Sequence, residues 1–235
     1  MPLRKIKKKR EPNWKEWDRL AQKEGLRAPI TSVNGDVYTG EWKDDLKHGK
    51  GTQVWKASGD LYDGDWEAGM RHEFGTLSVR DEDSGEYIKK YSGGWKHDKR
   101  HGYGTNYYSQ RECYEGEWQR GQRGGWGRMH YSDGSVYEGE WLGDQRSGKG
   151  LLRLPNGNRY EGTWERDMKN GEGRFLHQDK GQVYSGTWVD DVAKCGVMED
   201  VDRDSAPHSP PYPIPQCTLE DSDAVLTAAR EHHLQ

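Results

Sequence analysis

The sequence predicts a mainly β protein: a single-layer, twisted antiparallel sheet of seven stacked β-hairpin repeats, with short N- and C-terminal helices as caps. The first observation is a repeated pentapeptide, Tyr-x-Gly-x-Trp, and the second is its regular spacing of 23 to 29 residues. Self-similarity at such a period is typical of repeat arrays, whose units bury their apolar faces only against one another. The copies begin at Tyr38, Tyr62, Tyr91, Tyr114, Tyr137, Tyr160 and Tyr184.

Composition is the third observation. The 235 residues include 11 Trp and 13 Tyr but only 2 Phe, and the formal net charge is −4. Since each aromatic ring can bury roughly 150–250 Å², a core made mostly of rings is feasible. The 31 glycines recur periodically, which argues against a flexible linker.

One repeat shows how the pentapeptide forms a strand. Alternate residues of a strand share a face, so Tyr137, Gly139 and Trp141 point to one side of the sheet, and Glu138 and Glu140 to the other. The glycine between the two rings leaves space for an aromatic side chain over the backbone. We therefore expect an aromatic face and an acidic face.

A second strand follows in each repeat. Gly148 and Gly150, seven and nine residues after the Trp, start it on the aromatic face, and Asn156-Gly157 closes the hairpin. Asn-Gly predicts a two-residue turn with positive φ at both residues. Seven hairpins give about fourteen strands, and an insertion at 81–90 predicts a longer loop in the third repeat.

The repeated pattern is that of a known family. Tyr-Glu-Gly-Glu-Trp, then Lys-x-Gly-x-Gly, a short strand and Asn-Gly-x-x-Tyr, resembles the MORN repeat (membrane occupation and recognition nexus) over roughly residues 38–205. The resemblance implies a non-enzymatic scaffold that tethers partner proteins, often in male germ cells, flagella or cilia. Because dimerisation is typical of the family, the resemblance also implies a homodimer as one assembly of this chain.

Location is predicted from what the sequence lacks. No apolar run approaches the length of a membrane span, and residues 2–9 are basic with no apolar stretch behind them, so we expect no secretory signal. Three unpaired cysteines fit a reducing compartment. We expect a cytoplasmic protein; the resemblance adds the flagellum, the cytoskeleton or the surface of the sperm acrosomal vesicle.

The N-terminal region has two predicted parts. We expect residues 1–12 to be a basic, disordered tail, and residues 13–25 predict a helix with Trp14 and Trp17 on one face and Gly25 as its end. An open sheet leaves unpaired edges. This helix is therefore either a cap over the first strand or a partner-binding element.

Residues 206–235 combine a Pro-rich linker with an acidic tail that is compatible with a helix. Residues 209–213 contain a Pro-x-x-Pro match, a motif of peptide docking that also occurs by chance in linkers. Two alternatives stay open, an ordinary linker and a docking segment.

The aromatic face is the first candidate binding site. A single-layer sheet has no second sheet over its rings, and an exposed apolar groove marks an interaction surface. We expect protein partners to bind there. The predicted protein-binding groove consists of Tyr91, Trp95, Tyr114, Trp118, Tyr137, Trp141, Tyr160 and Trp164.

A column of cations, the basic rim, is the second candidate. Each cation at an anionic lipid surface can contribute about 1 kcal/mol, which predicts, as the alternative function, a peripheral membrane protein that binds acidic phospholipids through the rim and residues 4–10. Acidic residues in the same loops favour another interpretation, in which salt bridges reduce loop repulsion. In the first six repeats the rim residue stands five positions after the Trp, and Ala193 breaks the series in the seventh; the rim consists of Lys47, Arg71, Arg100, Arg123, Arg146 and Lys169.

Catalysis has little support in the sequence. An acidic stripe is predicted on the other face, but its copying from repeat to repeat indicates a surface pattern, not one catalytic pair. The histidines and cysteines lack metal-ligand spacing. We expect no enzyme activity, cofactor or metal, and no nucleic acid, because the array is net negative. The stripe consists of Glu115, Glu117, Glu138, Glu140 and Glu161.

Overall fold

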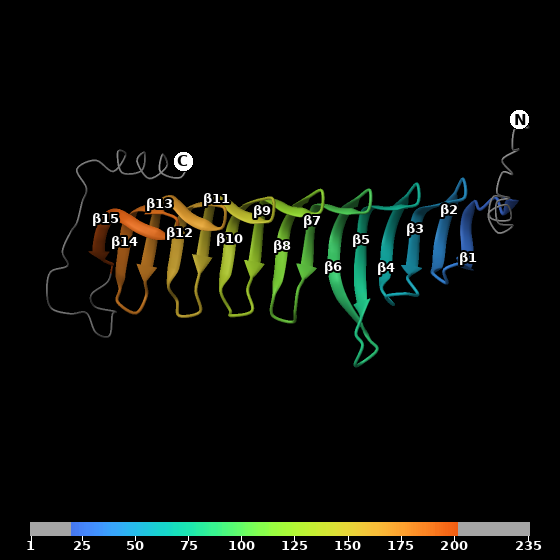
Figure 1. The fold of residues 1–235 in the computed structure, drawn as a ribbon, viewed down its shortest axis with the longest axis horizontal. Helices are drawn as coiled ribbons and strands as arrows, with labels where there is room; N and C mark the ends of the chain where they lie inside the picture. The colour runs from blue at the N-terminus through green and yellow to red at the C-terminus, as the bar shows by residue number, and fades with distance from the viewer. Residues whose placement is uncertain (1–19, 202–235) are drawn as a thin grey trace, which may run out of the picture. The chain divides into compact units, whose positions relative to one another are not determined.

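A computed structural model describes residues 20–201 of the chain, which form fifteen strands. The strands pair antiparallel in sequence order, giving one 15-stranded sheet (Figure 1). The predicted mainly β architecture of successive hairpins is confirmed. The strands are β1 (Gly25–Thr31), β2 (Val37–Lys43), β3 (Leu46–Val54), β4 (Leu61–Glu67), β5 (Met70–Arg80), β6 (Tyr87–Lys96), β7 (Lys99–Tyr107), β8 (Cys113–Gln119), β9 (Gln122–His130), β10 (Val136–Leu142), β11 (Gln145–Arg153), β12 (Arg159–Glu165), β13 (Met168–His177), β14 (Gln182–Val189) and β15 (Val192–Asp200).

Two compact units can be described, each by itself. Unit 1 takes the described residues through Lys89 together with Trp95–Lys99, and unit 2 takes Lys90–Gly94 together with the described residues from Arg100 onward. Unit 1 therefore holds the first two repeats, and unit 2 holds repeats four to seven.

The N-terminal end differs from the expectation. Within the described part of the predicted helix 13–25, only Leu20 is helical, and Gly25 begins β1 instead of ending a helix. Gly25 has φ +68° and lies opposite Trp42, so its backbone conformation starts an extra strand beside β2. This strand raises the count from fourteen to fifteen; residues 1–19, and the predicted linker and tail 206–235, lie outside the described residues.

The two-residue turns join the first strand of a repeat to its second strand, whereas the sequence predicted them between the second strand and the next repeat. Between β10 and β11, Gly143 and Asp144 both have positive φ (57° and 70°), as a two-residue turn requires. At Asn156-Gly157 only the glycine does (85°), and the Asn156 side chain accepts the Asn158 N–H at 3.1 Å. The prediction of a two-residue turn there is wrong, because Asn156 uses its side-chain oxygen to hold a three-residue loop.

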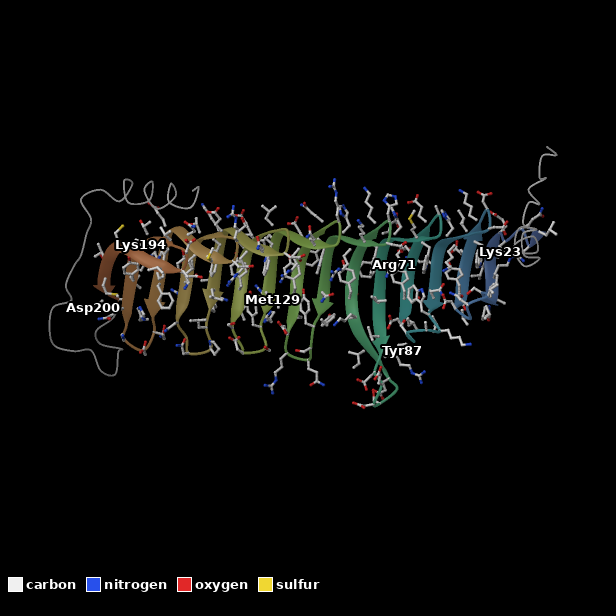
Figure 2. All side chains as sticks on the ribbon, viewed as in Figure 1. Lys23, Arg71, Tyr87, Met129, Lys194 and Asp200 are labelled. Atoms are coloured by element: carbon white, nitrogen blue, oxygen red, sulfur yellow. The ribbon has the colours of Figure 1, made fainter. Side chains whose placement is uncertain are left out.

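The insertion at 81–90, which precedes Tyr91 of the third repeat, lengthens a hairpin. Strands β5 and β6 extend to a turn at residues 81–86, where the Asp81 N–H donates to the Glu86 carbonyl at 2.8 Å. The Asp81 carboxylate accepts both the N–H and the hydroxyl of Ser84, at 2.7 and 2.8 Å. Tyr87, at the start of β6, lies on this extension (Figure 2).

Burial alternates along the strands as predicted. In β8, Tyr114 and Trp118 are 0% and 1% exposed, whereas Glu115 and Glu117 between them are exposed. The same alternation recurs in β2 and β10. The core of each unit is therefore the column of Tyr and Trp rings on one face of the sheet.

Close glycine pairs bring the strands of a hairpin together. Gly139 on β10 lies opposite Gly150 on β11, and a Cβ on Gly150 would overlap the Tyr137 hydroxyl. That hydroxyl donates to the Glu140 carbonyl at 3.1 Å, at a register shift between Gly139 and Trp141. Glycine is required at Gly150 because the tyrosine ring lies directly over its backbone.

Candidate protein-binding face

Each interior tryptophan joins two repeats. The Trp141 ring packs edge-to-face on Tyr137 of its own repeat and Tyr114 of the preceding one, with centroids 5.2 and 5.3 Å apart. Its Nε1–H donates to the Gly127 carbonyl on β9 at 3.1 Å. Such pairs add about 0.5–1.5 kcal/mol beyond area burial, so the rings fix both the stacking and the register of neighbouring repeats. The same indole bond to the preceding repeat is made by Trp66, Trp95, Trp118 and Trp164.

The predicted groove is not open among the described residues. Its eight rings are 0–5% exposed, although the described residues form no second sheet. The expectation that these rings form an exposed apolar groove is therefore wrong. The rings are core, and a partner cannot touch them without displacing what covers them. Protein binding at this face stays a prediction.

The cover comes from the basic rim, which the sequence placed in loops. The Arg123 guanidinium carbon lies 4.3 Å from the Trp141 ring centroid, a cation–π distance. Its Nε donates to an Asp144 carboxylate oxygen at 3.2 Å, and that oxygen also accepts the Arg123 backbone N–H at 2.9 Å. Each rim side chain thus lies over the Trp of the next repeat. The six pairs are Lys47 on Trp66, Arg71 on Trp95, Arg100 on Trp118, Arg123 on Trp141, Arg146 on Trp164 and Lys169 on Trp188.

The rim is mostly neutralised by neighbouring acids. Arg146 pairs with Asp167 at 3.1 Å and the Arg146 side chain is 19% exposed. Burial lowers the pKa of Lys169, although Asp191 opposes that shift. The sequence left two interpretations of the rim open, lipid binding and salt bridges with neighbouring acids. These contacts are the salt bridges of the second interpretation.

Most carboxylates of the acidic stripe also have hydrogen-bond or ion-pair partners within the sheet. The Glu140 carboxylate accepts the Lys149 N–H at 3.1 Å and lies over Gly148, whose φ is +64°. Glu117 does the same for the Trp126 N–H at 3.2 Å. Glu138 pairs with Arg128. Glu117 and Glu140 satisfy backbone donors and Glu138 pairs with an arginine, so the outer face is not a continuous free acidic surface.

What lies open on the aromatic face of unit 2 is a row beside the rings. Tyr108 is 40% exposed, and Tyr131 and Leu154 are half-buried at the same position in the next two repeats. Burial raises the pKa of Tyr108, and the guanidinium of Arg123 opposes that shift. The pKa of Tyr131 is also raised by burial, opposed by Arg146 and Arg123. We call this surface, formed by Arg100, Tyr108, Arg123, Tyr131, Arg146 and Leu154, the Arg/Tyr face.

Comparison with known proteins decides the family. The family model described as "MORN repeat" matches six segments, at residues 38–59, 62–82, 91–109, 114–136, 137–159 and 160–182. The chain belongs to the MORN repeat family. It is 62% identical over 231 residues to MORN repeat-containing protein 3 of Xenopus laevis, covering 98% of this chain and 97% of that protein. It is 61% identical to the Homo sapiens protein of that name and 60% to the Mus musculus one, each over 229 residues, 97% of this chain and 95% of the relative.

A seventh MORN-like repeat follows the six matched segments. The Tyr184 and Trp188 rings of β14 pack edge-to-face at 5.5 Å, and Gly186 lies opposite Gly196 on β15. Gly196 stands eight residues after Trp188, not nine, so the repeat has lost one residue and keeps its glycine pair. This loss explains why glycine is missing at the usual offsets.

The described residues hold two free cysteines and no candidate metal cluster. Within residues 20–201, no group of three or more His, Cys, Asp or Glu side chains could hold a metal ion. Cys113 and Cys195 are free thiols. No described helix has the length and apolarity to cross a membrane.

Proposed function

We propose that this chain is a non-enzymatic scaffold that tethers partner proteins through its MORN array. The observation that carries the proposal is the Arg/Tyr face, which repeats the same chemistry from one MORN repeat to the next. Tyr and Arg are enriched among residues that dominate protein–protein binding energy. Arg123 and Arg146 are already held in place by Asp144 and Asp167, and Arg100 by Asn106, so a partner would order few of these side chains on binding.

We place this activity in the cytoplasm, in germ-cell, flagellar or ciliary assembly. The family relationship supports this setting, and the repeated face supports tethering, because several partners or one extended partner can use consecutive repeats. Protein is the partner that we propose over lipid, since the rim cations lie over indole rings and four of the six also pair with carboxylates. Each would have to leave those contacts to reach a membrane.

A pull-down from germ-cell extract tests the proposal. The full-length chain should retain a stoichiometric partner through a high-salt wash, and the double variant Tyr108→Ser/Tyr131→Ser should lose it. Hot-spot side chains cost about 2 kcal/mol or more when truncated, so the purified partner should bind the double variant at least roughly tenfold more weakly. Tyr103→Ser is the matched control, because Tyr103 is exposed and lies beside Glu115 on the outer face.

Two results would contradict the proposal. Equal partner affinity for the double variant, with its circular dichroism unchanged, removes the Arg/Tyr face as the site. Recovery of nothing but salt-labile binding to anionic vesicles, abolished by Lys7→Ala/Lys8→Ala/Lys9→Ala, favours the membrane alternative and its N-terminal basic run.

A further inference from the structure

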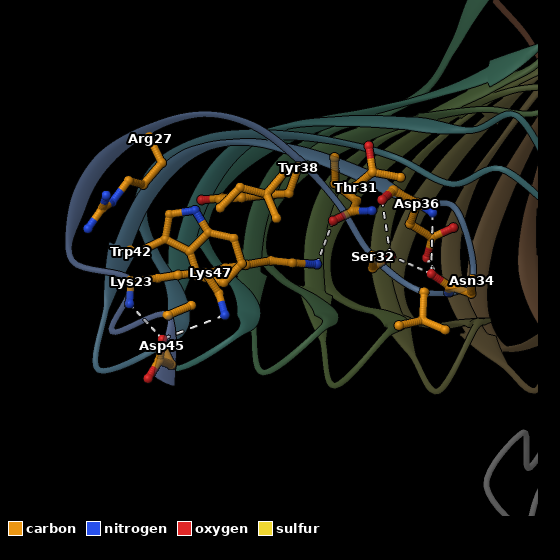
Figure 3. A pocket seen from close by; sticks show the side chains of 14 residues that line it. Lys23, Arg27, Thr31, Ser32, Asn34, Asp36, Tyr38, Trp42, Asp45 and Lys47 are labelled. Atoms are coloured by element: carbon orange, nitrogen blue, oxygen red, sulfur yellow. Dashed lines mark hydrogen bonds and ion pairs between the residues drawn. The ribbon is translucent and has the colours of Figure 1, made fainter. Parts of the chain in front are cut away.

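An open pocket of about 960 Å³ lies at the first repeat, in unit 1 (Figure 3). Its walls include Tyr38 and Trp42 of the aromatic face, Arg27 and Ile30 of β1, and Ala21, which precedes that strand. The pocket is distinct from the Arg/Tyr face, which belongs to unit 2.

Strand β1 is the second half of an incomplete repeat. Gly25 lies opposite Trp42 as Gly49 lies opposite Trp66, and both glycines have left-handed φ (68° and 58°). Lys23 acts as the rim residue of this half-repeat. Its Nζ lies 5.0 Å from the Trp42 ring centroid, and its backbone N–H donates to Asp45 at 2.6 Å (Figure 3).

Trp42 lacks two interactions that Trp66 of the second repeat has, a second tyrosine ring and an acceptor for its Nε1–H; the Nε1–H of Trp188 also has no acceptor among the described residues. Trp66 packs on two tyrosines, Tyr62 and Tyr38, at 5.1 and 5.5 Å, whereas Trp42 packs only on Tyr38 among the described residues. Trp66 Nε1–H donates to the Gly51 carbonyl at 3.0 Å.

The Trp42 Nε1–H is buried and unpaired within the described part of the chain, although the residue is only 9% exposed. A register shift in β1 between Arg27 and Ile30 lies where the accepting strand would continue. A buried donor without an acceptor is costly. The pocket therefore lacks one aromatic ring and one carbonyl.

We propose that the pocket binds the Trp17 side chain of the same chain, carried by residues 13–19. Trp17 stands four residues before Ala21, which lines the pocket, and four residues span at most about 14 Å. The indole supplies the missing ring against Trp42, and a backbone carbonyl of the segment supplies the acceptor for Nε1. This contact completes the first repeat within one chain and closes the open end of the aromatic face.

Hydrogen exchange of the full-length chain tests the assignment. Trp17→Ala should raise the exchange rates of the amides of β1 and β2 about tenfold or more and leave β10–β13 unchanged, because opening is local to unstacked elements. Trp126→Ala is the matched control, since Trp126 is half-exposed on the outer face of unit 2 and should leave β1 and β2 protected. A synthetic peptide of residues 11–20, added to the Trp17→Ala chain, should restore protection, and the same peptide with that substitution should not.

The remaining outcomes overturn the proposal. Unchanged exchange in Trp17→Ala means that Trp17 does not occupy the pocket. Loss of β1 and β2 protection on diluting the unaltered chain means that a second copy supplies the ring. Neither outcome tests the Arg/Tyr face, so the tethering proposal does not depend on this result.

Discussion

The two faces of strand β9 carry the same residue types in opposite situations. Arg123 lies over a buried indole and pairs with a carboxylate, and its side chain is 18% exposed; Arg128, on the outer face, pairs with Glu138 and is 47% exposed. Gly127 lies under the Tyr114 ring, whereas a Cβ on Gly124 would meet only the Gln119 side chain, at 3.5 Å. Residue type alone therefore does not tell whether a position holds the array together.

The pairing register of the strands explains why the two faces of β9 differ. On the aromatic face the tryptophan rings of repeats two to seven and the rim cations contact the adjacent repeat, so these side chains are fixed by at least two strands. On the outer face the contacts are cross-strand pairs that water can replace. Stability should be concentrated on one face, and the following matched substitutions test that inference.

The glycines should give the largest contrast. Gly127→Ala places a methyl group against the hydroxyl and ring carbons of Tyr114, so overpacking should cost about 3 kcal/mol. Gly124→Ala should change stability by less than about 1 kcal/mol, and in the stabilising direction if the backbone keeps its strand conformation. Urea unfolding of both variants measures this difference. Similar losses would show that both faces of β9 are equally tight.

Substitutions of the two tryptophans should give the second-largest contrast in stability. Trp141→Phe removes the hydrogen bond from Nε1–H to the Gly127 carbonyl and weakens the contact with Arg123, for a loss of about 2 kcal/mol. Trp126→Phe, at a residue that is 50% exposed, should cost less than about 0.5 kcal/mol. Thermal unfolding of the pair separates the two positions. A Trp126→Phe loss equal to that of Trp141→Phe would contradict the asymmetry.

The arginines should give a smaller contrast. Arg123→Lys keeps the charge but loses the planar stack on Trp141 and the forked contacts with Asp144, at a cost of about 1 kcal/mol. Arg128→Lys alters an exposed pair and should cost no more than about 0.5 kcal/mol. Chemical unfolding in low and high salt also distinguishes them, since salt should screen only the exposed pair.

The fold could be predicted from the sequence because its signals are local and repeated seven times. The alternation of Tyr, Gly and Trp fixed the buried face, and burial of Tyr114 and Trp118 confirmed it. The cover over the rings was missed because the basic rim was placed in loops. A two-residue turn at Gly143-Asp144 instead puts Arg146 directly opposite Trp141, inside the strand and on the aromatic face.

A usable signal for that cover was present in the sequence. An aspartate stands three residues after the Trp at Asp45, Asp98, Asp144, Asp167 and Asp191. These partner the rim residue, or Lys23, of the preceding repeat, 21 to 27 residues earlier in the chain. Charges so far apart in sequence cannot be paired without knowing the register. The strand β1 was missed for a related reason, since it lacks the pentapeptide that marks the other hairpins.

The smallest effect should come from a single tyrosine at alkaline pH. Burial, assisted by Glu41, raises the pKa of Tyr38 to about 12, above about 10 in the unfolded chain. The contribution of the neutral hydroxyl, which donates to the Glu41 carbonyl at 3.0 Å, is therefore complete below about pH 10 and is lost as the pH rises toward 12. Tyr38→Phe should be less stable than the unaltered chain near pH 8, by about 1 kcal/mol, and this difference should shrink or reverse near pH 11. Tyr87→Phe, at an exposed position on the β5–β6 hairpin, controls for loss of a hydroxyl. A pH-independent difference between Tyr38→Phe and the unaltered chain would mean that the ring on the aromatic face titrates as freely as one in water.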